Sequence, residues 1–261
     1  MAKQHSDEMP FLDHLEELRW RILWSLLALV IAVGIGFAIM LKVDIVRLLE
    51  RPIANYLPQG KLYFTHPADP FNIVLGASVA LGIVLALPVI LYQLWAFVSP
   101  ALYKNEKRVV IPLLFFATFL FLAGVCLAFF VVLPLAVEWL MGFQTGGLTP
   151  MITALDYFDF AISMAIAFGL AFELPIAILG LAALGLVTPQ LLNRYRRHAL
   201  VVCVIVGAFL TPGDLIWTTI AMSVPLYLLY EISVALTYVV YRRRQRREAR
   251  ELAATRGEAT A

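Results

Sequence analysis

The sequence predicts an all-α integral membrane protein with six transmembrane helices. The chain is 62% apolar and only 15% charged, whereas soluble domains carry about 25% charged residues. Its apolar residues form long runs, and a helix needs about 20 of them to cross the hydrocarbon core of a bilayer. The lysines and arginines fall almost entirely on one side of a six-span topology, which is the pattern expected of the cytoplasmic side.

Six apolar runs define the expected spans: residues 22–41, 70–97, 109–140, 157–186, 198–210 and 215–241. Asp69 would be the N-cap of the second span, with Pro70 in its first helical position. The fifth run is short and would reach only about 20 Å at 1.5 Å per residue. Either local thinning of the bilayer or burial of the helix end against neighbouring helices would therefore be needed.

The charged residues orient the predicted bundle with both termini in the cytoplasm. One side carries the positive charges of residues 1–21, 104–108, 194–197 and 242–256, while the other carries only those of the loop at 42–69. We interpret residues 1–21 as an amphipathic lead-in that lacks the features of a signal peptide. The basic tail, residues 242–261, is expected to be disordered. The whole chain, 1–261, is expected to form a single membrane domain.

Several prolines lie within or between the predicted spans, and two interpretations of their role are possible. Pro52 interrupts the outer loop, and Pro88 and Pro175 lie within predicted spans. Membrane helices tolerate proline because neighbouring groups satisfy the freed backbone. Alternatively, the bends that prolines cause would curve the bundle and give it a concave face that accepts a partner.

Acidic residues within predicted spans are candidate functional groups. Glu173 lies near the middle of the fourth span and Glu231 within the sixth. An intramembrane carboxylate is costly unless it is neutral, paired or hydrated, so each is a functional candidate by default. A hydrogen-bonded glutamic acid inside the bundle is the structural alternative. The sequence shows no enzyme signature and no metal-binding spacing. We therefore expect no enzyme activity, no cofactor and no nucleic-acid binding.

The expected cytoplasmic edge carries two polar motifs. HLEELRWR at 14–21 opens the first span and contains Glu17, while PALYKNE at 100–106 precedes the third and contains Glu106. Either carboxylate could be no more than a solvated residue at a helix N-terminus, where acids are favoured.

These two motifs resemble the TatC family, the multispanning signal-recognition subunit of the twin-arginine protein translocase. Further similarity lies in PVILYQLWAF at 88–97, FELP at 172–175 and LTPGD at 210–214. The resemblance implies six helices in a cupped bundle in the cytoplasmic (inner) membrane of a bacterium or archaeon. It implies binding of the paired-arginine signal peptide of folded cargo, and transport driven by the proton-motive force. Implied partners are single-span TatA/TatB-type subunits and further copies of the chain.

On this basis we expect Glu17 and Glu106 to accept the signal's guanidinium groups, because a carboxylate can accept two parallel N–H bonds. Arg19 would orient that edge or contact the peptide, and Arg21 belongs to the same edge. Leu94 and Phe97 would hold the apolar residues that follow the arginines. Glu173 would meet a polar residue of a partner's span, and partner spans would gather near Thr211 and Asp214.

Two other functions compete with this hypothesis. A proton-coupled small-solute transporter would use Glu173 and Glu231, and would be expected to show internal repeat symmetry. The sequence has no such repeat, and its polar cytoplasmic edge also argues against this class. An assembly scaffold without a ligand of its own is the third possibility.

Overall fold

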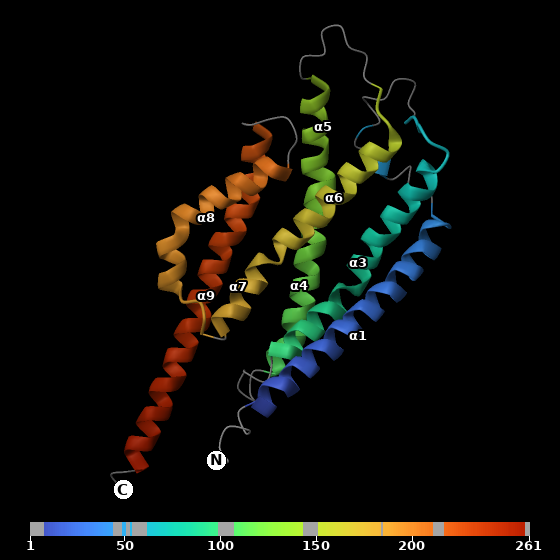
Figure 1. The fold of residues 1–261 in the computed structure, drawn as a ribbon. Helices are drawn as coiled ribbons and strands as arrows, with labels where there is room; N and C mark the ends of the chain where they lie inside the picture. Colours follow the sequence, from blue (N-terminus) through green and yellow to red (C-terminus); the bar gives the residue numbers. More distant parts are fainter. Residues whose placement is uncertain are drawn as a thin grey trace. The chain divides into compact units, whose positions relative to one another are not determined.

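The structure, a computed structural model, describes residues 8–43, 49–50, 53, 62–98, 107–142, 151–183, 185–210 and 217–258. Within these residues the chain is built from helices, with one isolated parallel bridge between Tyr63 and Thr153 (Figure 1). The helices are α1 (Glu8–Met40), α3 (Asp69–Val98), α4 (Lys107–Leu127), the π-helical η4 (Ala128–Val132), α5 (Leu133–Gly142), α6 (Ala154–Phe172), α7 (Leu174–Ala183), α8 (Pro189–Leu210) and α9 (Trp217–Glu258). This confirms the all-α prediction.

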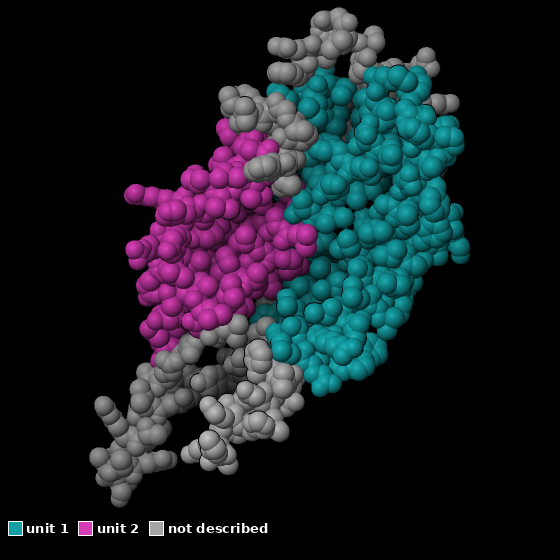
Figure 2. Space-filling view, in the orientation of Figure 1, with its two compact units in different colours: residues 1–167 teal, residues 168–261 magenta. Residues whose placement is uncertain are grey.

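The chain divides into two compact units, residues 1–167 and 168–261 (Figure 2). Large apolar side chains are exposed in both units, among them Val30 at 67%, Phe115 at 77% and Val224 at 55%. Such exposure suits a lipid-facing surface, because lipid tails are as apolar as these side chains.

Five described helical segments are long and apolar enough to cross a membrane: His14–Met40, Asp69–Phe97, Leu114–Gly142, Ala154–Ala182 and Met222–Arg242. They cover five of the six predicted spans. Helix α8, which carries the predicted fifth span, is not among them because Arg194, Arg196 and Arg197 occupy its first half. Its apolar part is short, as the sequence predicts.

Two helices in the second unit are longer than predicted. Helix α8 begins at Pro189 rather than His198. The Thr188 hydroxyl accepts a hydrogen bond from the Leu191 N–H at 3.3 Å, so Thr188 caps this helix and Pro189 fits its first position. Helix α9 continues to Glu258. The basic tail is therefore helical over residues 242–258, where the sequence-based prediction was disorder.

Helices α1 and α3 run side by side in the first unit (Figure 1). Their backbones approach closely at two glycines. A Cβ on Gly82 would lie 2.8 Å from Val33 Cα and 2.9 Å from Val33 N, and one on Gly36 would lie 2.7 Å from the Ser78 carbonyl oxygen. Only glycine permits such contacts, which pair the C-terminal part of α1 with the first half of α3 in antiparallel register.

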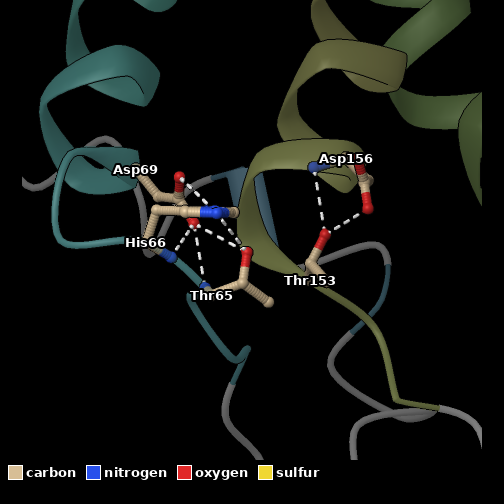
Figure 3. Close-up of polar contacts among 5 residues, drawn as sticks. All are labelled: Thr65, His66, Asp69, Thr153 and Asp156. Carbon is tan, nitrogen blue, oxygen red and sulfur yellow. Dashed lines mark hydrogen bonds and ion pairs between the residues drawn. The ribbon is translucent and has the colours of Figure 1, made fainter.

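The two helix starts at one end of this unit are held by short polar contacts (Figure 3). The Asp69 carboxylate accepts hydrogen bonds from the N–H groups of Thr65 and His66, each at 2.9 Å. Asp69 therefore ties α3 to the preceding turn and does not act as the predicted N-cap. At the start of α6, the Thr153 hydroxyl accepts from the Asp156 N–H at 3.3 Å and donates to its carboxylate.

Prolines have three different consequences in these helices. Pro88 lies inside a continuous α3. One turn before Pro134, α4 passes into the π-helical segment Ala128–Val132, where the Leu133 N–H bonds the Ala128 carbonyl. The predicted fourth span breaks at Glu173, between α6 and α7, immediately before buried Pro175. Pro52 lies outside the described residues.

The second unit packs α7 and α8 against α9. Leu192, Tyr230 and Val234 form a buried cluster, with Ile178 of α7 packed against it. The Tyr230 hydroxyl donates to the Leu192 carbonyl at 2.6 Å, which satisfies both polar groups inside this cluster.

The glycine contact generates a prediction on stability. Gly82→Ala should lower the free energy of unfolding by about 1–3 kcal/mol, the usual cost of overpacking. Gly34→Ala is the matched control in α1, because a Cβ there meets nothing within 4 Å. Thermal unfolding of the purified variants in detergent measures both. If Gly82→Ala is as stable as the wild type, the close backbone contact between α1 and α3 does not contribute to the stability of the protein.

Candidate functional site

A polar cluster lies where α1 begins and α3 ends. Positions 14, 17 and 21 are three and four residues apart, so they share one face of α1. In the antiparallel pair this face meets the last turns of α3, which supply Gln93 and Phe97. The sequence folds this way locally because the glycine contacts fix the register of the two helices.

Glu17 is the centre of the cluster and is already engaged by a guanidinium group. Arg21 donates two N–H bonds to the same carboxylate oxygen, Oε1, one of them from Nε at 3.0 Å. The Arg21 Nη1 also donates to Gln93 Oε1 at 3.4 Å. The Glu17 side chain is 34% exposed and that of Arg21 is 22% exposed, so the pair is only partly screened by solvent.

His14 completes the cluster. Its Nδ1 lies 3.5 Å from the second carboxylate oxygen of Glu17, Oε2, and its side chain is 49% exposed. The imidazole also stacks on Phe97, with ring centroids 4.4 Å apart and planes inclined by 13°. The arrangement therefore joins a partly exposed carboxylate to a flat aromatic surface. Both are groups to which a guanidinium binds well.

The structure brings together only some of the predicted edge residues. Glu17, Arg21 and Phe97 belong to the cluster. Leu94 is 57% exposed on α3, and Arg19 is exposed on α1. Arg21 is the arginine that bonds Glu17, and the expectation that Arg19 orients this edge or contacts the peptide stays a prediction. Glu106 lies outside the described residues.

Sequence reasoning missed two members of the cluster, His14 and Gln93. His14 could have been found from its spacing, since it lies one helical turn before Glu17. Gln93 had no such signal, because its place opposite Arg21 depends on the register of α1 against α3.

The intramembrane acids have different settings. Both carboxyl oxygens of Glu173 are buried, and they have no hydrogen-bond partner among the described residues. Glu173 lies at the break between α6 and α7, where its N–H bonds the Leu170 carbonyl at 3.1 Å. A buried carboxyl group left in this state is costly, so Glu173 remains a functional candidate.

In contrast, each carboxylate oxygen of Glu231 has a hydrogen-bond partner. Its Oε2 accepts from Arg196 Nη2 at 2.8 Å, and its Oε1 accepts from the Tyr227 hydroxyl at 2.8 Å. Glu231 is therefore part of an ion pair that links α8 to α9, a setting different from that of Glu173, and its role as a functional candidate stays a prediction. Thr211 and Asp214 lie outside the described residues.

Comparison with known proteins identifies the family. Residues 13–225 match the family model described as Sec-independent protein translocase protein (TatC). The chain belongs to the TatC family. It is 39% identical to TatC of Aquifex aeolicus over 91% of this chain and 98% of the relative. It is 37% identical to TatC of Escherichia coli K12, over 87% of this chain and 88% of the relative.

Solved structures agree with this assignment. A crystal structure named twin arginine translocase receptor TatC is similar with a TM-score of 0.74 and 39% identity, over 87% of this chain and 98% of that chain. A second crystal structure of the same receptor, in the detergent DDM, gives a TM-score of 0.75 and 40% identity. The chain is therefore a multi-pass membrane component of a protein translocase and not an enzyme. The solute-transporter alternative is not favoured.

Proposed function

We propose that this TatC chain binds the paired-arginine signal peptide of folded cargo at the edge formed by the start of α1 and the end of α3. One observation carries the proposal: Glu17 is a partly exposed carboxylate in a setting that already accepts two N–H bonds from a guanidinium group. A site that holds the guanidinium of Arg21 has the chemistry to hold a second one.

The chemistry of the cluster favours arginine over lysine. A guanidinium is planar, presents several N–H donors in a fixed fork and is more weakly hydrated than an ammonium group. Arg21 uses only Oε1 of Glu17. Oε2 has His14 Nδ1 at 3.5 Å, and a carboxylate oxygen can accept a further N–H from a ligand. Glu106, in the motif that precedes the third span, is the second carboxylate of the proposed site. The two signal arginines would then each have an acceptor.

Apolar residues beside the cluster fit the rest of the ligand. Leu94 is exposed and Phe97 is partly exposed, and both lie on the last turns of α3. They form a surface on which the apolar residues after the arginine pair can pack. Burial of such side chains contributes about 25 cal/mol per Å² of apolar surface. Affinity would thus be shared between charged and apolar contacts.

The proposal places this site on the cytoplasmic side, which the distribution of Lys and Arg favours. Partners are single-span TatA/TatB-type subunits and further copies of this chain, and energy comes from the proton-motive force. Glu173, with its buried carboxyl oxygens, offers a hydrogen-bonding group to a polar residue of a partner's span. Partner spans would gather beside the short apolar part of α8 and the segment that contains Thr211 and Asp214.

The first prediction tests the binding site. Glu17→Gln and Glu106→Gln should each weaken binding of an Arg-Arg signal peptide about tenfold or more, since a hydrogen bond to a charged group contributes about 1.5–3 kcal/mol. Glu16→Gln is the matched control, because Glu16 is an exposed neighbour on α1. Binding of a fluorescent peptide to detergent-solubilised protein measures the effect. Tight binding of the Arg-Arg peptide by the double Gln variant, with the Lys-Lys version still rejected, contradicts the proposed site.

The second prediction concerns Glu173. Glu173→Gln keeps a hydrogen-bonding group and should have little effect, whereas Glu173→Leu should weaken partner association by about 1–2 kcal/mol. Glu138→Leu is the control, because Glu138 is exposed near the end of α5. Co-purification with the single-span subunits reports association. Normal association and transport by Glu173→Leu would show that Glu173 has only a structural role.

The third prediction concerns orientation. Single cysteines at Asn105, Arg196 and Ala261 should react with a membrane-impermeant reagent only from the cytoplasmic side. Cysteines at Gln59 and Gly146 should react only from outside. The two native cysteines, Cys126 and Cys203, are replaced first in all variants. Labelling of positions 105 and 146 from the same side would rule out the six-span topology.

A further inference from the structure

His14 has no role in the proposed function, yet its position is as well defined as that of Glu17. One face of its imidazole ring stacks on Phe97 at 4.4 Å between centroids. Its Nδ1 edge faces Glu17 Oε2 at 3.5 Å, and about half of the side chain, 49%, is exposed. The ring is therefore held flat against α3 while part of its surface stays open.

The open side of Glu17 lies next to this ring. Arg21 directs both of its N–H bonds to Oε1 and leaves Oε2, the oxygen nearest His14, without a bond from it. Arg21 is also held from the other side by Gln93. A ligand group that donates to Oε2 of Glu17 would therefore lie next to the imidazole of His14.

We propose that His14 is a specificity-determining residue of the signal-binding site, whose imidazole ring, backed by Phe97, is the platform on which a ligand guanidinium stacks while it donates to Glu17 Oε2. This inference rests on the proposed function and deepens it. It names the group that distinguishes arginine from lysine, which a carboxylate alone does only in part.

The physical reason lies in the shape of the two cations. A guanidinium is flat and stacks on aromatic faces, whereas an ammonium group is a compact, strongly hydrated charge without a plane. On the His14 ring, a guanidinium can therefore use its face for stacking and its edge for the carboxylate. A lysine that reaches Glu17 gains the charge contact but not the stacking. Phe97 stabilises the platform because it restricts the tilt of the ring.

The test compares two substitutions of His14. His14→Phe keeps an aromatic plane, and His14→Leu removes it at similar volume. Each full-length variant is titrated in detergent with the Arg-Arg signal peptide and with its Lys-Lys version. We expect His14→Leu to lose about two- to fivefold in affinity for the Arg-Arg peptide, the effect of an exposed contact between a cation and a ring. Its affinity for the Lys-Lys peptide should not change. His14→Phe should retain the wild-type ratio of the two affinities.

The outcomes separate this inference from the function on which it rests. If wild-type protein shows no preference for the Arg-Arg peptide, the proposed function fails. If the wild type has the preference and His14→Leu keeps it, the platform is wrong and His14 only packs against Phe97. If His14→Leu loses affinity for both peptides by the same factor, the proposed stacking role of His14 is also wrong. His14→Asn, which lacks a ring but stays polar, provides the same comparison should the leucine variant not fold.

Discussion

The close contact between α1 and α3 is the constraint on which the candidate site depends. Gly82 lets the backbone of α1 lie against α3 at Val33, and Gly36 does the same opposite Ser78. The same antiparallel register places Arg21 opposite Gln93 and, further along, His14 on Phe97. A shift of one residue between the helices would turn these side chains to different faces. The polar cluster thus depends on Gly36 and Gly82, because their lack of a side chain lets the two helices pack in this register.

Hydrogen bonding inside the helices explains why one acid stands out. In lipid, polar groups must be satisfied within the protein. Several hydroxyls accordingly donate to a carbonyl one turn earlier in their own helix, among them those of Ser25, Ser78, Thr118, Ser233 and Thr237. Glu231 is satisfied by Arg196 and Tyr227. Glu173 departs from this pattern within the described chain, and that departure makes it a candidate for contact with a partner.

A proline in the sequence predicts a local disturbance of its helix, but not the form that the disturbance takes. The sequence predicts a disturbance at each proline, since proline removes a backbone donor. The structure accommodates Pro88 within α3, places a π-helical segment before Pro134, and separates α6 from α7 just before Pro175. The outcome depends on how the surrounding backbone compensates for the missing N–H. That compensation involves groups outside the proline's own turn.

The sequence by itself determined the class of the protein and the position of most helices. Long apolar runs can satisfy their backbone in lipid only as helices, and the composition therefore identified the membrane fold. It also named Glu17, Arg21 and Phe97 as candidates, and in the structure these three residues belong to one cluster. It misjudged the start of α8 and the extent of α9, where polar residues continue a helix beyond its apolar part.

Only the tertiary structure decided which of the polar residues meet. It showed that Arg21 bonds Glu17, added His14 and Gln93 to the cluster, and gave Glu231 a different setting from that of Glu173. Such pairings depend on the register and the distance between helices. These are set by glycine contacts and by side-chain packing from segments far apart in the chain, and no local pattern in the sequence encodes them.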